Sequence, residues 1–112
     1  MIQIEHKGKV IATNVSLADN FKDKLCGYMF QSKPHKPGIL FVHAPGIHTF
    51  FMHFNLDVIF LDGDSRILKI YRNMKPWRHT WFHYTSKKTL ELPAGKFPQD
   101  INEGDVLEVR NV

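Results

Sequence analysis

Hydrophobic and polar positions alternate along much of this chain with the two-residue period of β-strands. Near the N-terminus this alternation occurs in residues 2–4 and again in residues 10–12, on either side of Lys7-Gly8. Two alternating segments separated by a glycine-containing turn are typical of a β-hairpin. The first part of the chain is therefore predicted to be a hairpin.

Two apolar segments in the middle of the chain predict buried strands. Residues 39–42 form a continuous apolar run, and residues 56–61 give the strongest strand signal. Asp62-Gly63-Asp64 follows as a hairpin turn, so residues 66–72 are predicted to return beside residues 56–61. Further strands are expected at 47–54, 90–92 and 106–109, with a long loop over 73–85.

One segment has helical spacing. Leu17, Phe21 and Leu25 are four residues apart and would share one helix face, with Ser16 as the N-cap and Gly27 after the last turn. We therefore expect one short helix at about residues 17–26. Together these elements predict a single domain over residues 1–112, mainly β, with a small distorted β-sandwich or barrel-like fold and one short helix.

The composition is that of an ordinary folded domain. Hydrophobic residues make up 43% and charged residues 23% of the 112 residues, which excludes extensive disorder. The only cysteine, Cys26, excludes an intramolecular disulfide framework and a cysteine-rich zinc site. No apolar run approaches the ~20 residues of a membrane span, and the N-terminus does not resemble a signal peptide. We therefore expect a soluble, cytoplasmic protein without a membrane partner or a cofactor.

Positive charge and aromatic side chains are concentrated in one stretch. The formal net charge is +4, and residues 65–90 contain seven Lys and Arg and no acid. Aromatic residues are interleaved with these cations, among them Tyr71, Trp77 and Tyr84. Such a stretch fits a solvated strand face, a surface for an anionic or saccharide-like ligand, or a nucleic-acid-binding surface over residues 66–88.

Asp57 is the most informative polar residue, because its predicted strand is apolar on both faces. A carboxylate there must accept hydrogen bonds or meet a cation. It has either a structural role, with loop backbone or an arginine as partner, or a role as ligand acceptor or general base. The expected hairpin register places Asp57 opposite Arg72 or an immediate neighbour. We therefore predict that Asp57 lies beside Arg72 or Arg78, at the rim of a cleft.

Histidines close to Asp57 in sequence are further candidates. His48 and His53 fall on opposite faces of the predicted 47–54 strand. His48 has a structural alternative, a hydrogen bond that fixes the turn after Gly46. A metal site would require His43, His48, His53 and Asp57 to converge with good geometry, and we expect none.

Residues 46–62 read GIHTFFMHFNLDVIFLD, and further short motifs follow the same order at 27–30, 38–41, 76–78, 90–95 and 104–105. Over nearly its whole length the chain resembles domain-of-unknown-function family 192, in which His-Thr-Phe-x-Met-Arg-Phe-Pro-Ile-Asp-Val-x-Phe-Leu-Asp is common. The resemblance implies a mostly β sandwich and supplies no established activity, cofactor or catalytic residues. His53 stands where the family usually has Arg, and Asn55 where it has Pro. If that Arg binds an anion, His53 would make the binding pH-dependent.

These observations together favour a ligand-binding protein. The expected ligand is a small anionic or saccharide-like molecule, held in a cleft between the 48–57 segment and the Trp77 loop. The candidate residues are His48, His53, Asp57, Arg72, Trp77 and Arg78. The alternatives are a hydrolase-type enzyme that uses Asp57 with a histidine, and a nucleic-acid-binding module.

Overall fold

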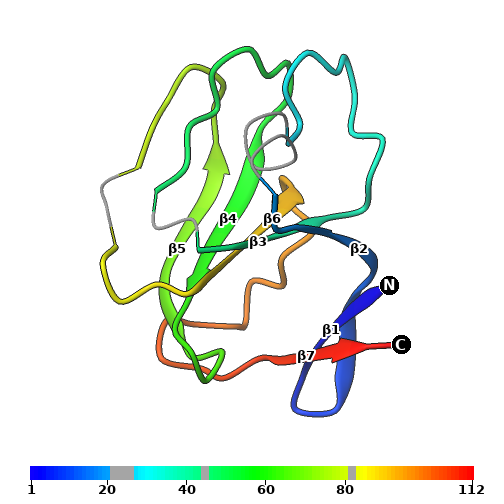
Figure 1. Ribbon diagram of the computed structural model, residues 1–112, viewed down its shortest axis with the longest axis vertical. Coiled ribbons are helices and arrows are strands. Elements are labelled where there is room, and N and C mark those ends of the chain that lie inside the picture. Colours follow the sequence, from blue (N-terminus) through cyan, green and yellow to red (C-terminus); the bar gives the residue numbers. More distant parts are fainter. Residues whose placement is uncertain (21–26, 44–45, 81–82) are drawn as a thin grey trace.

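The computed structural model describes residues 1–20, 27–43, 46–80 and 83–112 (Figure 1). These residues contain seven β-strands, which are β1 (Ile2–His6), β2 (Lys9–Ala18), β3 (Ile39–Val42), β4 (Leu56–Leu61), β5 (Ile67–Met74), β6 (Lys88–Pro93) and β7 (Glu108–Asn111).

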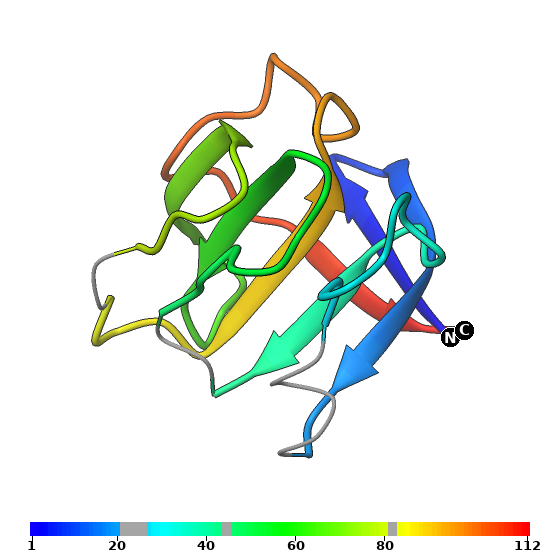
Figure 2. The same cartoon turned by 90° about the horizontal axis from the view of Figure 1, so that it is seen from above.

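The seven strands form one strongly bent sheet in the order β5-β4-β6-β3-β2-β1-β7 (Figures 1 and 2). β2 and β3 are parallel, and all other neighbours are antiparallel. The start of β5 also pairs with the segment that leads into β7, through an isolated bridge between Arg66 and Val106. The Ile67 N–H donates to the Asp105 carbonyl at 2.8 Å in the same region. Both edges of the sheet are therefore connected at this end.

Two apolar clusters hold the fold together. One includes Ile59, Leu61 and Leu90, and the other includes Val58, Phe60 and Ile39. Successive side chains of a strand point to opposite faces, so β4 contributes to both clusters. This explains why all six residues of β4 are buried and why its sequence, apart from Asp57, is apolar without alternation.

The mainly β prediction is confirmed, but the predicted short helix at about 17–26 is wrong where it can be compared. β2 continues to Ala18, and Ser16 and Leu17 pair with β3 as strand residues. This pairing buries Ala18 and leaves Leu17 45% exposed, so the four-residue spacing does not mark a buried helix face. Phe21, Leu25 and Cys26 lie outside the described residues. Among the residues described, nothing helical has the length and hydropathy of a membrane span. The sandwich or barrel-like form stays a prediction.

Most of the predicted strands are confirmed, with two corrections. Residues 47–54 do not form a strand, and within them only His48 makes a bridge, to His79. The last strand begins at Glu108 rather than at residue 106. The first hairpin turns where expected, with Lys7 at φ 50° and Gly8 at φ 78°.

Three long connections gather at one end of the molecule, beyond the start of β4 and the end of β5 (top of Figure 1). They comprise residues 27–38, 46–55 and 75–80. Tyr28, Met52 and the partly buried Phe54 of these connections pack on the second apolar cluster. The ring of Tyr28 meets that of Phe54 edge-on, at 5.3 Å between centroids. The sheet and this cluster thus fix the base of all the loops that carry the candidate site.

Candidate functional site

Four aromatic side chains form an exposed group at this end of the molecule. We call Phe30, Phe50, Phe51 and Trp77 the aromatic platform, and they are 71%, 37%, 44% and 56% exposed. Their rings make a continuous row, in which Phe30 contacts Phe51 at 5.1 Å, Phe51 contacts Trp77 at 4.8 Å and Trp77 contacts Phe50 at 5.9 Å between centroids. The rings of Phe50 and Trp77 are nearly parallel, with 29° between their planes. Contiguous exposed apolar surface of this kind marks binding sites on folded proteins.

The backbone of the platform is strained. Phe30, Phe51 and Trp77 have φ values of 63°, 63° and 62°, which is the left-handed region. This conformation costs a residue with a Cβ about 1–2 kcal/mol relative to the right-handed region. Strain of this kind is concentrated at functional sites, where the surrounding structure holds it in place.

The surrounding structure does so here through Thr49, which is fully buried. Its hydroxyl donates to the Lys75 carbonyl at 2.7 Å and accepts from the Arg78 N–H at 2.9 Å. Its backbone N–H donates to the Arg78 carbonyl at 2.8 Å, and its carbonyl accepts from the Trp77 N–H at 2.9 Å. One buried residue therefore ties the Phe50-Phe51 turn to the Trp77 loop and fixes the relative position of their rings.

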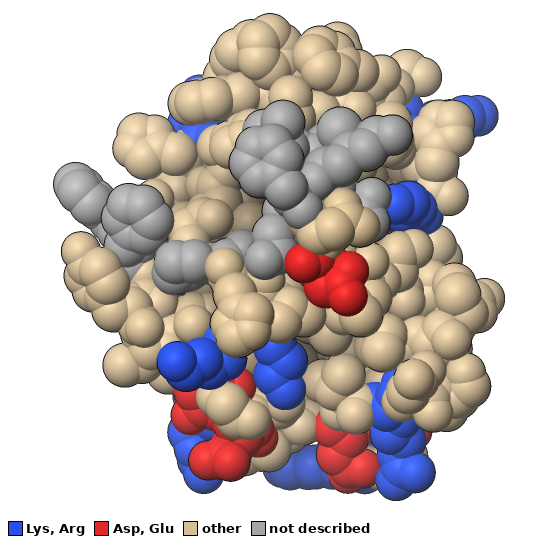
Figure 3. All heavy atoms as spheres, viewed as in Figure 1, with Lys and Arg blue, Asp and Glu red and all other residues tan. Residues whose placement is uncertain are grey.

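The platform has positively charged neighbours. Lys75 and Arg78 flank Trp77 and are exposed. Within the part of the chain that the structure describes, the Arg78 guanidinium makes only hydrogen bonds of 3.3 and 3.5 Å, to the carbonyls of Pro76 and Trp77. The three connections of residues 27–38, 46–55 and 75–80 contain no Asp or Glu. In Figure 3 the acidic atoms on the visible face lie near its centre and in its lower part, and Lys and Arg mark the margins of the upper end.

His48 borders the platform. Its ring lies 5.1 Å from that of Phe50, and its Nδ1 accepts from the Phe50 N–H at 3.3 Å. The other predicted histidine, His53, is exposed in the same connection. The structure thus places His48, Trp77 and Arg78 in neighbouring loops at this end of the molecule.

Asp57 is not part of this surface. It is 2% exposed and faces the first apolar cluster, where its carboxylate accepts three backbone N–H groups. The donors are Asn73 at 2.9 Å, Gly95 at 3.0 Å and Phe97 at 3.1 Å. The predicted ion pair with Arg72 or Arg78 is wrong, since no cation pairs with Asp57 among the described residues. The structural alternative, an Asp that holds loop backbone, is the one observed.

Arg72 holds the same loop from its carbonyl side. Its guanidinium donates to the carbonyls of Phe97, Pro98 and Ile101 at 2.9–3.0 Å and lies over the Phe97 ring at 5.3 Å. Asp57 and Arg72 are therefore near each other, as the register predicts. They form no ion pair with each other, but both bind the 95–101 segment. Asp57 accepts hydrogen bonds from its N–H groups, and Arg72 donates hydrogen bonds to its carbonyls.

The cations of the 66–88 stretch do not form one face. Arg72 is used as above, Arg66 donates to the carbonyl of Gly104 at 2.8 Å, and Lys69 pairs with Glu103 at 3.7 Å. Lys88 donates to a serine hydroxyl at 2.6 Å. Four of the seven cations thus bond to other parts of the fold, although Arg66 among them is exposed. The other three, Lys75, Arg78 and Lys87, are exposed as well.

Sequence reasoning missed Phe50 and Phe51 because it treated 47–54 as a strand, and it assigned no role to Phe30. It also missed Glu91, which lies in the middle of β6 opposite Val58 and Ile39 and is 1% exposed. Its Oε1 atom is buried without a hydrogen-bond partner, and burial raises the pKa of this carboxyl to about 8. Burial, and then the charge of Glu91, raise the pKa of the Tyr28 phenol well above its usual range. The alternation Leu90-Glu91-Leu92 does not predict that Glu91 is buried, since the same pattern fits a strand with an exposed acidic residue.

The histidines do not converge on a metal site within the described ranges. No group of three or more His, Cys, Asp or Glu side chains there is close enough to hold an ion. His83 instead pairs with the Tyr71 hydroxyl at 2.9 Å. Burial and the charge of Lys69 lower the pKa of His83.

The sequence and the fold of this chain are similar to those of known proteins. The sequence profile of DUF192, described as "Uncharacterized ACR", matches residues 2–109. The chain belongs to the DUF192 family. A UPF0127 protein of Thermococcus kodakarensis is 32% identical over 117 residues, which cover 96% of this chain and 71% of that protein. A UPF0127 protein of Pyrococcus furiosus is 31% identical over 111 residues, which cover 91% of each chain.

Two solved structures share the fold. A Novosphingobium aromaticivorans protein of unknown function has a TM-score of 0.79 and 21% identity, covering 96% of this chain and 82% of its own. A Sinorhizobium meliloti protein described as a putative transcription regulator has a TM-score of 0.77 and 21% identity, covering 96% and 91%. At 21% identity these two likenesses concern the fold alone.

Proposed function

We propose that this protein binds an anionic saccharide on the aromatic platform. The observation that carries the proposal is the row of four exposed aromatic rings, three of which occupy left-handed backbone positions. Glycine or asparagine would satisfy such turns with less strain. The aromatic side chains at these positions are therefore best explained by what they present to solvent.

A saccharide fits the geometry of the rings. The C–H groups on one face of a sugar carry partial positive charge and stack on the electron-rich face of an aromatic ring. The rings of Phe50 and Trp77 are stacked on each other, with 5.9 Å between their centroids, and both remain partly exposed to a ligand. The row continues through Phe51 to Phe30, which favours a chain of sugar units over a single one.

The charge around the rings favours an anionic saccharide. Lys75 and Arg78 flank Trp77, and neither forms an ion pair with a described residue. Arg presents several N–H donors to a carboxylate, and both cations reach from the loop that carries the main stacking ring. The absence of acidic residues from the three connections removes the repulsion that an anion would otherwise meet.

Nucleic acid is the second candidate, because single strands also bind to cations and stacked aromatic rings. The description of the Sinorhizobium meliloti protein points the same way, although at 21% identity the similarity concerns the fold alone. Only two exposed Lys and Arg side chains flank Trp77, and most of the 66–88 cations are engaged elsewhere. A hydrolase that uses Asp57 receives no support, since three backbone donors occupy its buried carboxylate.

The test is calorimetric titration with trigalacturonate, a saccharide with one carboxylate per unit, and with neutral cellotriose. We expect trigalacturonate to bind more tightly, and Trp77→Ala to weaken it by at least tenfold, about 1.4 kcal/mol or more. Tyr84→Ala removes an aromatic ring that is 87% exposed and outside the platform, and should leave the affinity unchanged.

Three results would overturn the proposal. Unchanged affinity in Trp77→Ala would remove the platform from binding. Equal affinity for cellotriose would remove the recognition of the anion. Tighter binding of single-stranded (dT)10, with an affinity that falls steeply with salt, would establish the nucleic-acid function instead.

A further inference from the structure

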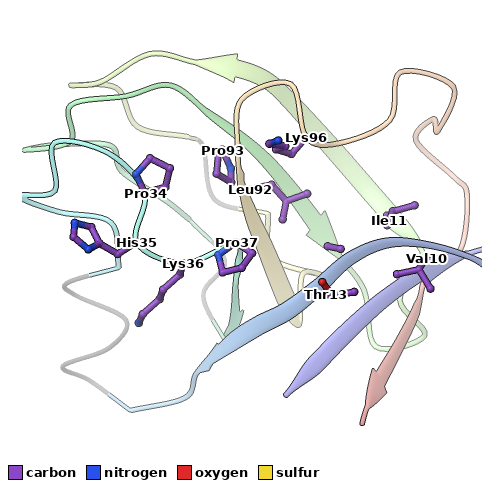
Figure 4. A pocket seen from close by; sticks show the side chains of 11 residues that line it. Val10, Ile11, Thr13, Pro34, His35, Lys36, Pro37, Leu92, Pro93 and Lys96 are labelled. Carbon is purple, nitrogen blue, oxygen red and sulfur yellow. The ribbon is translucent and has the colours of Figure 1, made fainter.

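A second surface feature is independent of the platform. An open pocket of ≈ 610 Å³ lies between β2, the loop before β3 and the end of β6 (Figure 4). Its lining comes from residues 10–13 of β2, residues 34–37, residues 92–93 and Lys96. Small-molecule sites have volumes of about 300–1,000 Å³, so this pocket has the size of a ligand site.

The pocket exists because the sheet is incomplete at this point. β3 pairs with β2 only over Ser16–Ala18, so residues 10–13 of β2 are paired with β1 on one side alone. The preceding loop contains Pro34 and Pro37, which have no N–H group and cannot extend the ladder along β2. Some backbone groups of residues 10–13 therefore face the pocket rather than another strand.

Residues 34–37 form one wall of the pocket and are held in place by contacts with buried side chains. The buried Tyr28 hydroxyl donates to the Lys36 carbonyl at 2.8 Å. Gly38 then enters the sheet so closely that a Cβ atom there would lie 2.6 Å from Leu92 Cδ2. These contacts fix the position of the segment that forms this wall of the pocket.

The lining combines apolar surface with positive charge. Leu92 and Pro37 lie around its middle, Ile11 lies at one side near Val10, and Lys36 and Lys96 lie toward its periphery (Figure 4). No lining residue is acidic, and neither lysine forms an ion pair with any residue that the structure describes. An apolar surface with unpaired cations at its margin is complementary to a molecule with an apolar body and an anionic group.

We propose that this pocket binds a small alkyl or aryl carboxylate, with its hydrocarbon part against Leu92 and Pro37 and its carboxylate toward Lys96 or Lys36. Fixed polar groups at the margin of an apolar pocket orient a ligand in this way. The pocket shares no residue with the aromatic platform, so this proposal does not depend on saccharide binding there.

The experiment is a titration of the 15N-labelled protein with octanoate, followed by amide chemical shifts. We expect saturable shifts in residues 10–13, 35–36 and 92–96, and none at Trp77. Lys96→Glu should weaken binding by about tenfold. Lys33→Glu is the control, since Lys33 carries the same charge in the loop that contributes Lys36 but does not line the pocket, and it should change the affinity less than twofold.

An uncharged ligand and a substitution that fills the pocket complete the test. 1-Octanol should bind at least tenfold more weakly than octanoate, and Thr13→Tyr should block the pocket from an exposed strand position. Octanoate shifts that do not saturate, that occur at the platform, or that persist in Thr13→Tyr would overturn the proposal. Equal effects of Lys96→Glu and Lys33→Glu, or equal binding of the alcohol, would show that the site does not recognise the carboxylate.

Discussion

Glu91 allows a quantitative prediction of how stability depends on pH. Its carboxyl is buried in the centre of the sheet, and burial raises its pKa from 4.5 to about 8. Between these values the folded protein holds a proton that the unfolded chain has released. The contribution of the protonated Glu91 carboxyl to the free energy of unfolding is therefore fully present below pH 4.5. As the pH rises from 4.5 to 8, this contribution is lost by about 1.4 kcal/mol per pH unit. Over the whole interval the loss is about 5 kcal/mol, a large part of the stability of a small domain.

The assay is urea unfolding of the wild-type protein and Glu91→Gln at pH 5, 7 and 9. Glutamine keeps the shape of the side chain and does not titrate, so the difference between the two proteins isolates the carboxyl. From pH 5 to pH 9 the free energy of unfolding of the wild-type protein should fall by several kcal/mol relative to that of Glu91→Gln. The same change at exposed Glu108 should shift the difference little. If the Glu91 difference is the same at pH 5 and pH 9, the carboxyl does not hold a proton in the fold and the reasoning fails.

Three further substitutions test the contacts around the site, each by urea unfolding. Thr49→Val leaves a buried carbonyl and N–H unpaired and should cost about 1–3 kcal/mol, whereas Thr49→Ser should cost much less because it keeps the hydroxyl. Asp57→Ala removes the acceptor of three N–H groups and should cost about 3 kcal/mol or more, against little for exposed Asp100→Ala. Arg72→Lys loses the planar fork that reaches three carbonyls and should cost about 2 kcal/mol, and a loss below about 0.5 kcal/mol would contradict this role.

Local pattern was sufficient for most of the sheet. The apolar run at 39–42 and the continuous hydrophobicity of 56–61 identify strands because both of their faces are buried. The same pattern failed at Leu17, where a four-residue spacing suggested a helix. Parallel pairing with β3 extends β2 through this position, and such pairing with a segment about twenty residues away leaves no local signal.

The candidate site was only partly predictable for a related reason. A carboxylate on an apolar strand must have partners, and this requirement correctly singled out Asp57. Its partners proved to be backbone N–H groups of Gly95 and Phe97, about forty residues away, rather than an arginine. The platform depends on backbone conformation at Phe51 and Trp77, and on one buried threonine that joins their loops. None of these features has a sequence period.

The central claim is that the aromatic platform is the ligand-binding surface. The most direct measurement is an amide and indole chemical-shift map of the 15N-labelled protein during titration with trigalacturonate. We expect saturable shifts at Phe50, Phe51 and the backbone and indole N–H of Trp77, with no change at Ile11 or Lys96 in the separate pocket. Saturable shifts confined to residues away from the platform, or no shifts at millimolar trigalacturonate, would contradict it.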